Sequence, residues 1–307
     1  MSWWRRRPAE PALAAAADAG ARYHDLVLHF GGIPGLRPGE RRFPGRPQPA
    51  GVEVEAWQAY APGDDLRHLD WTVLGRLDAL LVRRFTAERE VVAHLLVDAS
   101  ASMADDKRAA AAELVLALAA IALRSGHSVR LVVLRGDGPP WVSALHRRAA
   151  SLPQLAGVLG GAVPAGALDL GAALGVWARQ RPEPAAALVV SDLLVDAAGL
   201  APGVRALGRA GAPVHLLHVL GPAELTPEEA LGSGLLVDAE TGAAHAIAMD
   251  PDTLARYRGL LDAHLAALAE VAAAAGARYA RLELPRPVAA FVTDDLVRLD
   301  LVRPRGR

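Results

Sequence analysis

Beyond residue 90 the sequence alternates short apolar runs with longer helical stretches, and this alternation limits the possible folds more than any other feature. The brief, almost continuously apolar runs are candidates for buried strands: Val91–Val97, Val129–Leu134, Ala187–Val190, Val214–Leu220 and Ala277–Leu282. The stretches between them are expected to be helices: Lys107–Arg124, Leu170–Arg179, Leu200–Ala210 and Pro251–Ala275. Trp141–Leu145 is expected to add an edge strand, and Gly234–Ile247 a hairpin. The pattern predicts an α/β fold with a doubly wound, mostly parallel sheet covered by helices on both faces.

Composition divides the chain into three parts. Residues 1–50 are predicted to hold an N-terminal helix over Pro11–Phe30 and then a linker, Gly31–Ala50, which is too rich in Gly, Pro and Arg for a helix or a central strand. Residues 51–89 are predicted to form a small β-rich extension. Residues 90–307 then carry the main α/β domain.

Charge and cysteine content exclude several classes of protein. The chain has 307 residues with 33 Lys plus Arg against 34 Asp plus Glu, so no overall field favours nucleic acid or an anionic membrane. It has no Cys, which excludes disulfides and Cys nucleophiles and fits a reducing compartment. The most apolar run, Ala109–Leu123, is shorter than the roughly 20 residues that span a bilayer. We therefore expect a cytoplasmic protein without a transmembrane segment, which contacts membranes only through partners.

Polar side chains follow two of the predicted strands at the point where each strand ends. Asp98, Ser100 and Ser102 follow the first strand at two-residue intervals, and Asp192 follows the third. In a doubly wound sheet, ligands gather beyond the carboxyl ends of the strands, and hard oxygen ligands suit Mg²⁺. The alternative is that Asp98 and the serines only cap the helix that follows.

This Asp-x-Ser-x-Ser pattern with a distant strand-end Asp resembles the metal-ion-dependent adhesion site of von Willebrand factor A domains. The resemblance implies that Asp98, Ser100, Ser102 and Asp192 surround Mg²⁺, and that a partner's carboxylate completes the metal shell. It also implies a Thr in the loop before the predicted helix Leu170–Arg179, at the position where this chain has Leu168. An alkyl side chain supplies no oxygen, so the site is degenerate and Mg²⁺ occupancy is left open.

A longer motif lies upstream in the β-rich segment. Its residues are Tyr60, Gly63, Asp64, Asp65, Arg67, Asp70, Trp71 and Arg76. Together with the Asp98 motif, it closely resembles the bacterial family catalogued as domain of unknown function 58. The aspartates and arginines can form an ion-pair network that fastens this segment to the main domain, or they can bind a partner directly.

The family resemblance also implies partners. Members of this family tend to be encoded beside MoxR-type AAA ATPases, which implies an adaptor in protein complex assembly or maturation. Many relatives carry N-terminal membrane helices, and this chain resembles the short form without them.

We therefore expect a non-enzymatic protein-interaction module, and two alternatives stay open. One is a Mg²⁺-dependent phosphohydrolase with Asp98 as nucleophile. Such enzymes, however, have a second Asp two residues after the nucleophile, where this chain has Ser100. The other is nucleic-acid binding through the basic loop 37–46, although that loop has few aromatic residues to stack on bases. Our expectation is that the chain does not bind nucleic acid.

Overall fold

The computed structural model describes residues 18–30, 54–61, 69–77, 79–85, 91–180, 185–209, 212–230, 234–240, 242–247 and 250–305. The chain separates into two compact units, and each is described by itself. The larger unit combines Met1–Pro34 with Val91–Arg307, and the smaller unit is Gly35–Glu90. The smaller unit is therefore an insertion within the larger one.

The larger unit is built on a six-stranded sheet with the strand order β11-β8-β7-β4-β5-β6. Five of the strands are parallel: β4 (Val92–Asp98), β5 (Ser128–Leu134), β7 (Ala185–Ser191), β8 (Val214–Leu220) and β11 (Arg278–Glu283). The short β6 (Trp141–Val142) pairs antiparallel with β5 at one edge. The predicted α/β fold with a mostly parallel sheet is confirmed. Strands β7 and β8 are buried along their whole length, which explains why their sequences are almost continuously apolar.

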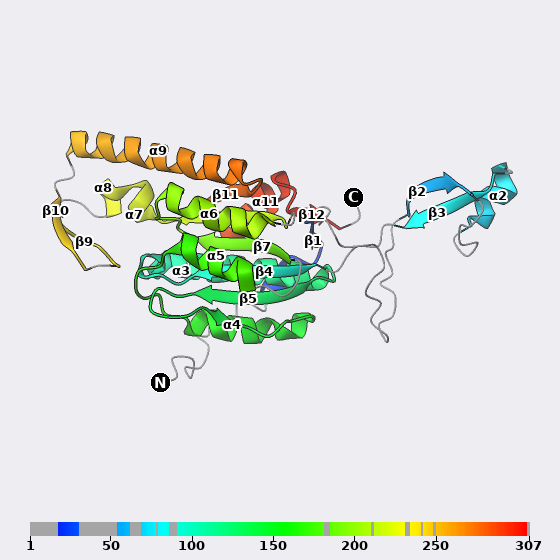
Figure 1. Ribbon diagram of the computed structural model, residues 1–307, viewed down its shortest axis with the longest axis horizontal. Helices are drawn as coiled ribbons and strands as arrows, with labels where there is room; N and C mark the ends of the chain where they lie inside the picture. The colour runs from blue at the N-terminus through cyan, green and yellow to red at the C-terminus, as the bar shows by residue number, and fades with distance from the viewer. Residues whose placement is uncertain are drawn as a thin grey trace. The chain divides into compact units, whose positions relative to one another are not determined.

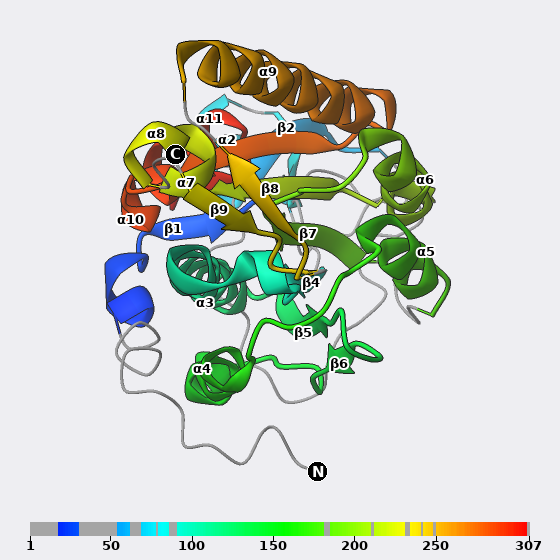
Figure 2. The ribbon, with the colours of Figure 1, turned by 90° about the vertical axis from the view of Figure 1, so that its left-hand side faces the viewer.

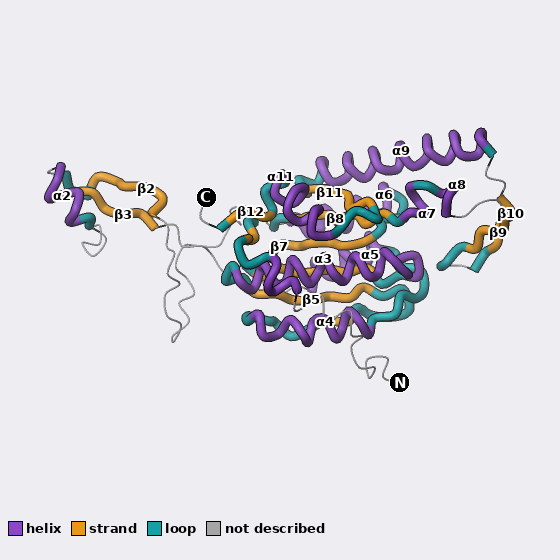
Figure 3. The backbone as a smooth tube through the Cα atoms, turned by 180° about the vertical axis from the view of Figure 1, so that it is seen from behind, coloured by secondary structure: helices purple, strands orange, loops and turns teal. Residues whose placement is uncertain are grey.

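Helices cover both faces of this sheet. Figure 1 shows α5 (Leu170–Gln180) and α6 (Ala197–Gly208) on one face, and their side chains share one core with those of α9 (Pro251–Ala274). Figure 3 shows α3 (Asp105–Arg124) on the other face, where it contacts α4 (Leu152–Gly161). Helix α3 is buried on nearly all sides from Leu114 to Leu123, so it is apolar without a polar stripe.

The N-terminal arm differs from its prediction. Residues 18–22 are helical, but the helix ends there, and Leu26–Leu28 forms strand β1. Strand β1 pairs antiparallel with β12 (Val302–Pro304), a three-residue strand close to the other end of the chain. The prediction of one helix through Phe30 was therefore wrong, because pairing with a distant strand outweighs the local helix propensity.

Short elements complete the larger unit. Strands β9 (Gly234–Val237) and β10 (Ala244–Ile247) form the predicted hairpin. The short helical segments, in chain order, are η2 (Ala101–Met103), η3 (Ala149–Ser151), α7 (Pro222–Leu225), α8 (Pro227–Ala230), α10 (Val288–Ala290), η5 (Phe291–Asp295) and α11 (Leu296–Arg298). Among the described residues, no helix is both long and apolar enough to cross a membrane.

The smaller unit contains the upstream motif. Strands β2 (Val54–Ala59) and β3 (Leu81–Phe85) pair antiparallel, and α2 (Trp71–Leu77) lies between them in sequence. The predicted β-rich segment therefore contains a two-stranded sheet and one short helix.

Candidate functional site

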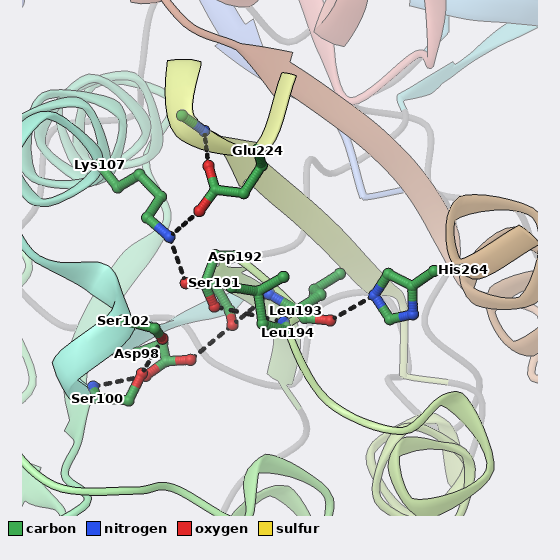
Figure 4. A network of polar contacts seen from close by, with 11 residues as sticks. Asp98, Ser100, Ser102, Lys107, Ser191, Asp192, Leu193, Leu194, Glu224 and His264 are labelled. Carbon is green, nitrogen blue, oxygen red and sulfur yellow. Dashed lines mark hydrogen bonds and ion pairs between the residues drawn. The ribbon is translucent and has the colours of Figure 1, made fainter. Parts of the chain in front are cut away.

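The carboxyl ends of β4 and β7 bring four predicted site residues to one edge of the sheet. The two strands are parallel neighbours, with Val97 opposite Val190, so Asp98 at the end of β4 lies beside the Ser191–Asp192 pair that follows β7. Figure 4 shows Asp98, Ser100 and Ser102 facing Ser191 and Asp192. We call these five residues the strand-end cluster.

Asp98 is fixed inside the cluster. It is 6% exposed, and each of its carboxylate oxygens has a donor: Oδ1 accepts from the Ser100 N–H at 2.8 Å and Oδ2 from the Ser191 hydroxyl at 2.6 Å. Burial raises the pKa of Asp98 above its usual value, although both hydrogen bonds act against that rise. The Ser191 hydroxyl also accepts from the Leu193 N–H at 2.9 Å, so one serine joins the two strand ends.

The two hydroxyls after Asp98 lie close together. Ser100 Oγ and Ser102 Oγ are 3.1 Å apart. Their loop is held to the loop of Gly166 by two backbone bonds, from the Ala101 N–H to the Gly166 carbonyl and from the Ala165 N–H to the Ala99 carbonyl. The loop that was predicted to complete a metal site therefore does lie beside the Asp98 loop.

Leu168, in that second loop, is partly buried and packs against the core that β7 shares with α5 and α6. The neighbouring Asp169 directs Oδ1 to the Ala172 N–H at 2.9 Å and caps the first turn of α5. Neither residue is seen to take the role of the missing Thr.

Asp192 is paired with a cation that the sequence reading did not identify. Lys107 on α3 donates to Asp192 Oδ2 at 2.7 Å and to Glu224 Oε1 at 2.5 Å (Figure 4). Glu224 is positioned in turn because its other oxygen accepts from the Gly221 N–H at 2.6 Å. Burial acts to lower the pKa of Lys107, but the two carboxylates outweigh it and the pKa is raised. The available signal was a single Lys in the charged first turn of α3, and its partners lie 85 and 117 residues further along the chain.

A further carboxylate reaches the cluster from the β9–β10 hairpin. Figure 2 shows this hairpin in front of the carboxyl ends of β4 and β7. Burial raises the pKa of Glu240 in its turn, and the nearby charges of Asp192, Asp98 and Asp238 raise it further, while a hydrogen bond with Ser102 lowers it. The hairpin was predicted, but its approach to the cluster was not.

The donor set of the cluster is incomplete for a resident Mg²⁺. The hydroxyls of Ser100 and Ser102 have a spacing that suits adjacent positions around a small cation. Asp192, however, is already paired with Lys107, and Leu168 supplies no oxygen. Within the described ranges, no three His, Cys, Asp or Glu side chains come together in a way that could hold a metal ion. Mg²⁺ occupancy therefore stays open, as it is from the sequence.

The upstream motif is partly visible in the smaller unit. Asp70 is 4% exposed and caps α2 through Oδ1, which accepts from the Val73 N–H at 3.3 Å. Trp71, by contrast, is 66% exposed on the first turn of that helix. Tyr60 follows β2, and Arg76 is exposed on α2. Gly63, Asp64, Asp65 and Arg67 lie outside the described residues, so the predicted ion-pair network stays a prediction.

Comparison with known proteins gives relatives in both sequence and structure. The model of a family described as "Protein of unknown function DUF58" matches residues 56–266. The uncharacterized proteins Rv1480 of Mycobacterium tuberculosis and Mb1516 of Mycobacterium bovis are each 32% identical to this chain over 298 residues, which is 92% of this chain and 86% of theirs.

Solved structures with a similar backbone include two proteins of low identity. BatB from Bacteroides thetaiotaomicron has a TM-score of 0.44 at 14% identity, covering 68% of this chain and 98% of its own. The VWA domain of SpRpn10 has a TM-score of 0.42 at 11% identity, covering 67% and 95%. The family itself is decided by sequence, because the family model spans more than half of the chain and the mycobacterial relatives span 92% of it. This chain belongs to the DUF58 family.

Proposed function

We propose that this chain is a non-catalytic protein-interaction module that contacts its partner through the strand-end cluster. One observation carries the proposal. Two strand ends that lie 93 residues apart in sequence are joined by the Ser191–Asp98 hydrogen bond, which fixes a polar cluster at the edge of the sheet where ligands of such folds gather, with Ser102 as its partly exposed member. A surface fixed before binding loses little conformational entropy when a partner docks.

The hydrogen bonds and the burial of Asp98 disfavour a role as nucleophile. An attacking carboxylate needs an oxygen that can approach a phosphorus atom. Both oxygens of Asp98 accept short hydrogen bonds within the protein, and the side chain is almost fully buried. The phosphohydrolase alternative therefore gains no support from the geometry. The nucleic-acid alternative depends on loop 37–46, which lies outside the described residues.

The partner follows from the family resemblance, which implies a MoxR-type AAA ATPase. We propose that the module acts as an adaptor of that ATPase in the assembly or maturation of protein complexes. The net charge of −1 fits a protein partner better than a polyanion, because a nucleic-acid binder would need a basic field.

Capture of the co-expressed MoxR-type ATPase of the same genome tests the proposal. We expect Asp98→Ala to weaken capture, because the Ser100 N–H and the Ser191 hydroxyl lose their acceptor and the loop loses its shape. Asp98→Asn keeps the shape of the side chain and is expected to weaken capture less.

Asp262→Ala is the matched control, because Asp262 is exposed on α9. Circular dichroism must show that every variant is folded. If Asp98→Ala captures as much ATPase as the wild type does, the strand-end cluster is not the contact surface.

A further inference from the structure

We propose that Lys107 is the resident cation of the strand-end cluster: its ammonium group holds Asp192 in place and opposes the binding of a divalent metal ion there. The proposal concerns the charge balance of the cluster and does not depend on which protein docks on it. It assigns a role to a residue outside the Asp-x-Ser-x-Ser motif.

Lys107 forms buried ion pairs with two carboxylates. Lys107 is 8% exposed, and its ammonium bridges Asp192 at 2.7 Å and Glu224 at 2.5 Å. It comes from α3, while its partners come from the end of β7 and from α7, so three elements meet at one nitrogen (Figure 4). Charge-assisted bonds of this length in a buried site are the strong kind.

Carboxylates gather around Lys107 at the strand-end cluster. Asp98, Asp192 and Glu240 influence one another electrostatically at this edge, and Glu224 lies on the far side of Lys107. Arg108, the next residue along α3, donates to the Gly160 carbonyl and does not join the cluster. Among the described contacts, Lys107 is therefore the cation that pairs with Asp192. Its ammonium group balances the carboxylate charge that a metal ion would balance in an adhesion-type site.

The Lys107 ammonium group and a metal ion bound to Asp192 exclude each other. A Mg²⁺ ion binds a carboxylate oxygen at about 2.1 Å. An ion on Asp192 Oδ2 would therefore lie within about 5 Å of the Lys107 nitrogen, because that nitrogen is 2.7 Å from the same oxygen. Two like charges at that separation repel each other strongly when water is largely excluded.

Leu168 is also consistent with a cluster that holds no metal ion. A metal-binding loop gains from a hydroxyl at that place, whereas an alkyl side chain there packs against the core. A buried ion pair is weak evidence for stability alone, since apolar replacements often do as well. The two ion pairs of Lys107 with Asp192 and Glu224 therefore suit a role in setting the charge of the cluster.

Calorimetric titration with MgCl₂ tests the proposal. We expect wild-type protein to show no binding up to about 10 mM Mg²⁺, and its melting temperature to stay the same with and without that concentration of Mg²⁺. Lys107→Met frees Asp192 and is expected to tighten Mg²⁺ binding at least about tenfold. Lys107→Arg retains the positive charge and is expected to behave as the wild type does.

The double variant Lys107→Met with Asp192→Asn separates this effect from simple loosening. It lacks the freed carboxylate, so its Mg²⁺ affinity should return to the wild-type level. If Lys107→Met does not fold, Lys107→Met with Glu224→Gln leaves only Asp192 without its partner, and the same gain is expected. Mg²⁺ binding by the wild type at micromolar concentration, or an unchanged affinity after removal of the Lys107 charge, would overturn the proposal. The wild-type melting curves test the first of these two outcomes without any variant.

Discussion

Ser191 is the single side chain that joins the two strand ends. Its hydroxyl donates to Asp98 and accepts from the backbone of Leu193, whose φ of 47° is unusual for a residue with a side chain. A serine therefore holds both the buried carboxylate and the turn that contains Asp192. Because this residue is 0% exposed, it acts on the surface of the cluster through the residues that it positions.

We predict that Ser191→Ala destabilises the protein by about 1–3 kcal/mol, because a buried carboxylate oxygen and a backbone N–H lose their partner. The pKa of Asp98 should rise further, since the hydrogen bond from Ser191 now lowers it. Urea unfolding measures the change in stability. Ser151→Ala, where no side-chain capping bond is present, should change the free energy of unfolding little. Equal effects of the two substitutions would show that the Ser191 bonds are not stabilising.

Leu168 gives a second prediction at the scale of one residue. We predict that Leu168→Thr raises the affinity for Mg²⁺, because a hydroxyl is restored to the loop beside Ser100 and Ser102. The substitution removes packing from the core and should cost about 1 kcal/mol of stability. Calorimetry in the Lys107→Met background, where the competing charge is absent, gives the larger signal. An equal or lower affinity there would mean that Leu168 does not stand where the metal ligand of the adhesion site stands.

Strand β8 carries two buried histidines, and their state ties stability to pH. His215 is 2% exposed, and neither of its ring nitrogens has a hydrogen-bond partner among the described residues. Burial lowers the pKa of His215 to about 3 and that of His218 to about 4. Both rings are therefore neutral in the folded protein at neutral pH. Two polar but uncharged rings are therefore buried on a strand whose other residues are apolar.

We predict that the protein loses stability as the pH falls below about 6.5, because the unfolded chain then binds protons at these histidines and the folded chain does not. His215 alone should contribute about 1.4 kcal/mol per pH unit in the window between its unfolded and folded pKa values, 6.5 and about 3. His215→Leu removes that contribution, so its stability should fall less steeply between pH 6.5 and pH 4.5 in urea titrations. Parallel pH profiles for the two proteins would contradict the shifted pKa.

The elements differ in how far the sequence predicts them. The β7 and β8 runs and α3 were predicted because a buried parallel strand and a buried helix each leave a continuous apolar pattern. Strand β1 was missed, since its three residues are stabilised by β12 at the opposite end of the chain. Asp98 and Asp192 could be placed at the same sheet edge from strand ends alone. The partnership of Lys107 with Glu224 could not, because the side-chain contact depends on how α7 turns back after β8.

At the scale of the molecule, the described N-terminal arm of the larger unit ends at Phe30 and the chain re-enters that unit at Val91, and both points lie within the larger unit near the start of β4. Phe30, close to where the insertion begins, packs against His127 with the rings tilted and their centroids 5.2 Å apart. Val91, where the chain returns, donates its N–H to His127 Nδ1 at 3.3 Å. The same His127 ring makes a bond with the Leu28 carbonyl. The two chain ends of the insertion therefore meet at one histidine, close to the amino ends of β4 and β5.

This meeting point predicts that the larger unit folds without the insertion. Replacing residues 31–90 with a short Gly/Ser linker should leave a protein that melts cooperatively and has the secondary structure expected of the parallel sheet, because closing a short loop between adjacent points costs little entropy. The six-stranded sheet, α3 and the strand-end cluster all lie outside the removed segment. Far-UV and near-UV circular dichroism with thermal melting are the measurements, with the full chain as control. His127→Ala in the shortened protein should lower its melting temperature, because both chain ends lose their common contact.

A shortened chain that lacks near-UV signal and cooperative melting would mean that the upstream motif is needed to fold the sheet. If the shortened chain folds and still captures the ATPase, the contact surface lies in the larger unit alone; if it folds and captures nothing, the motif of Asp70 and Trp71 belongs to the contact surface.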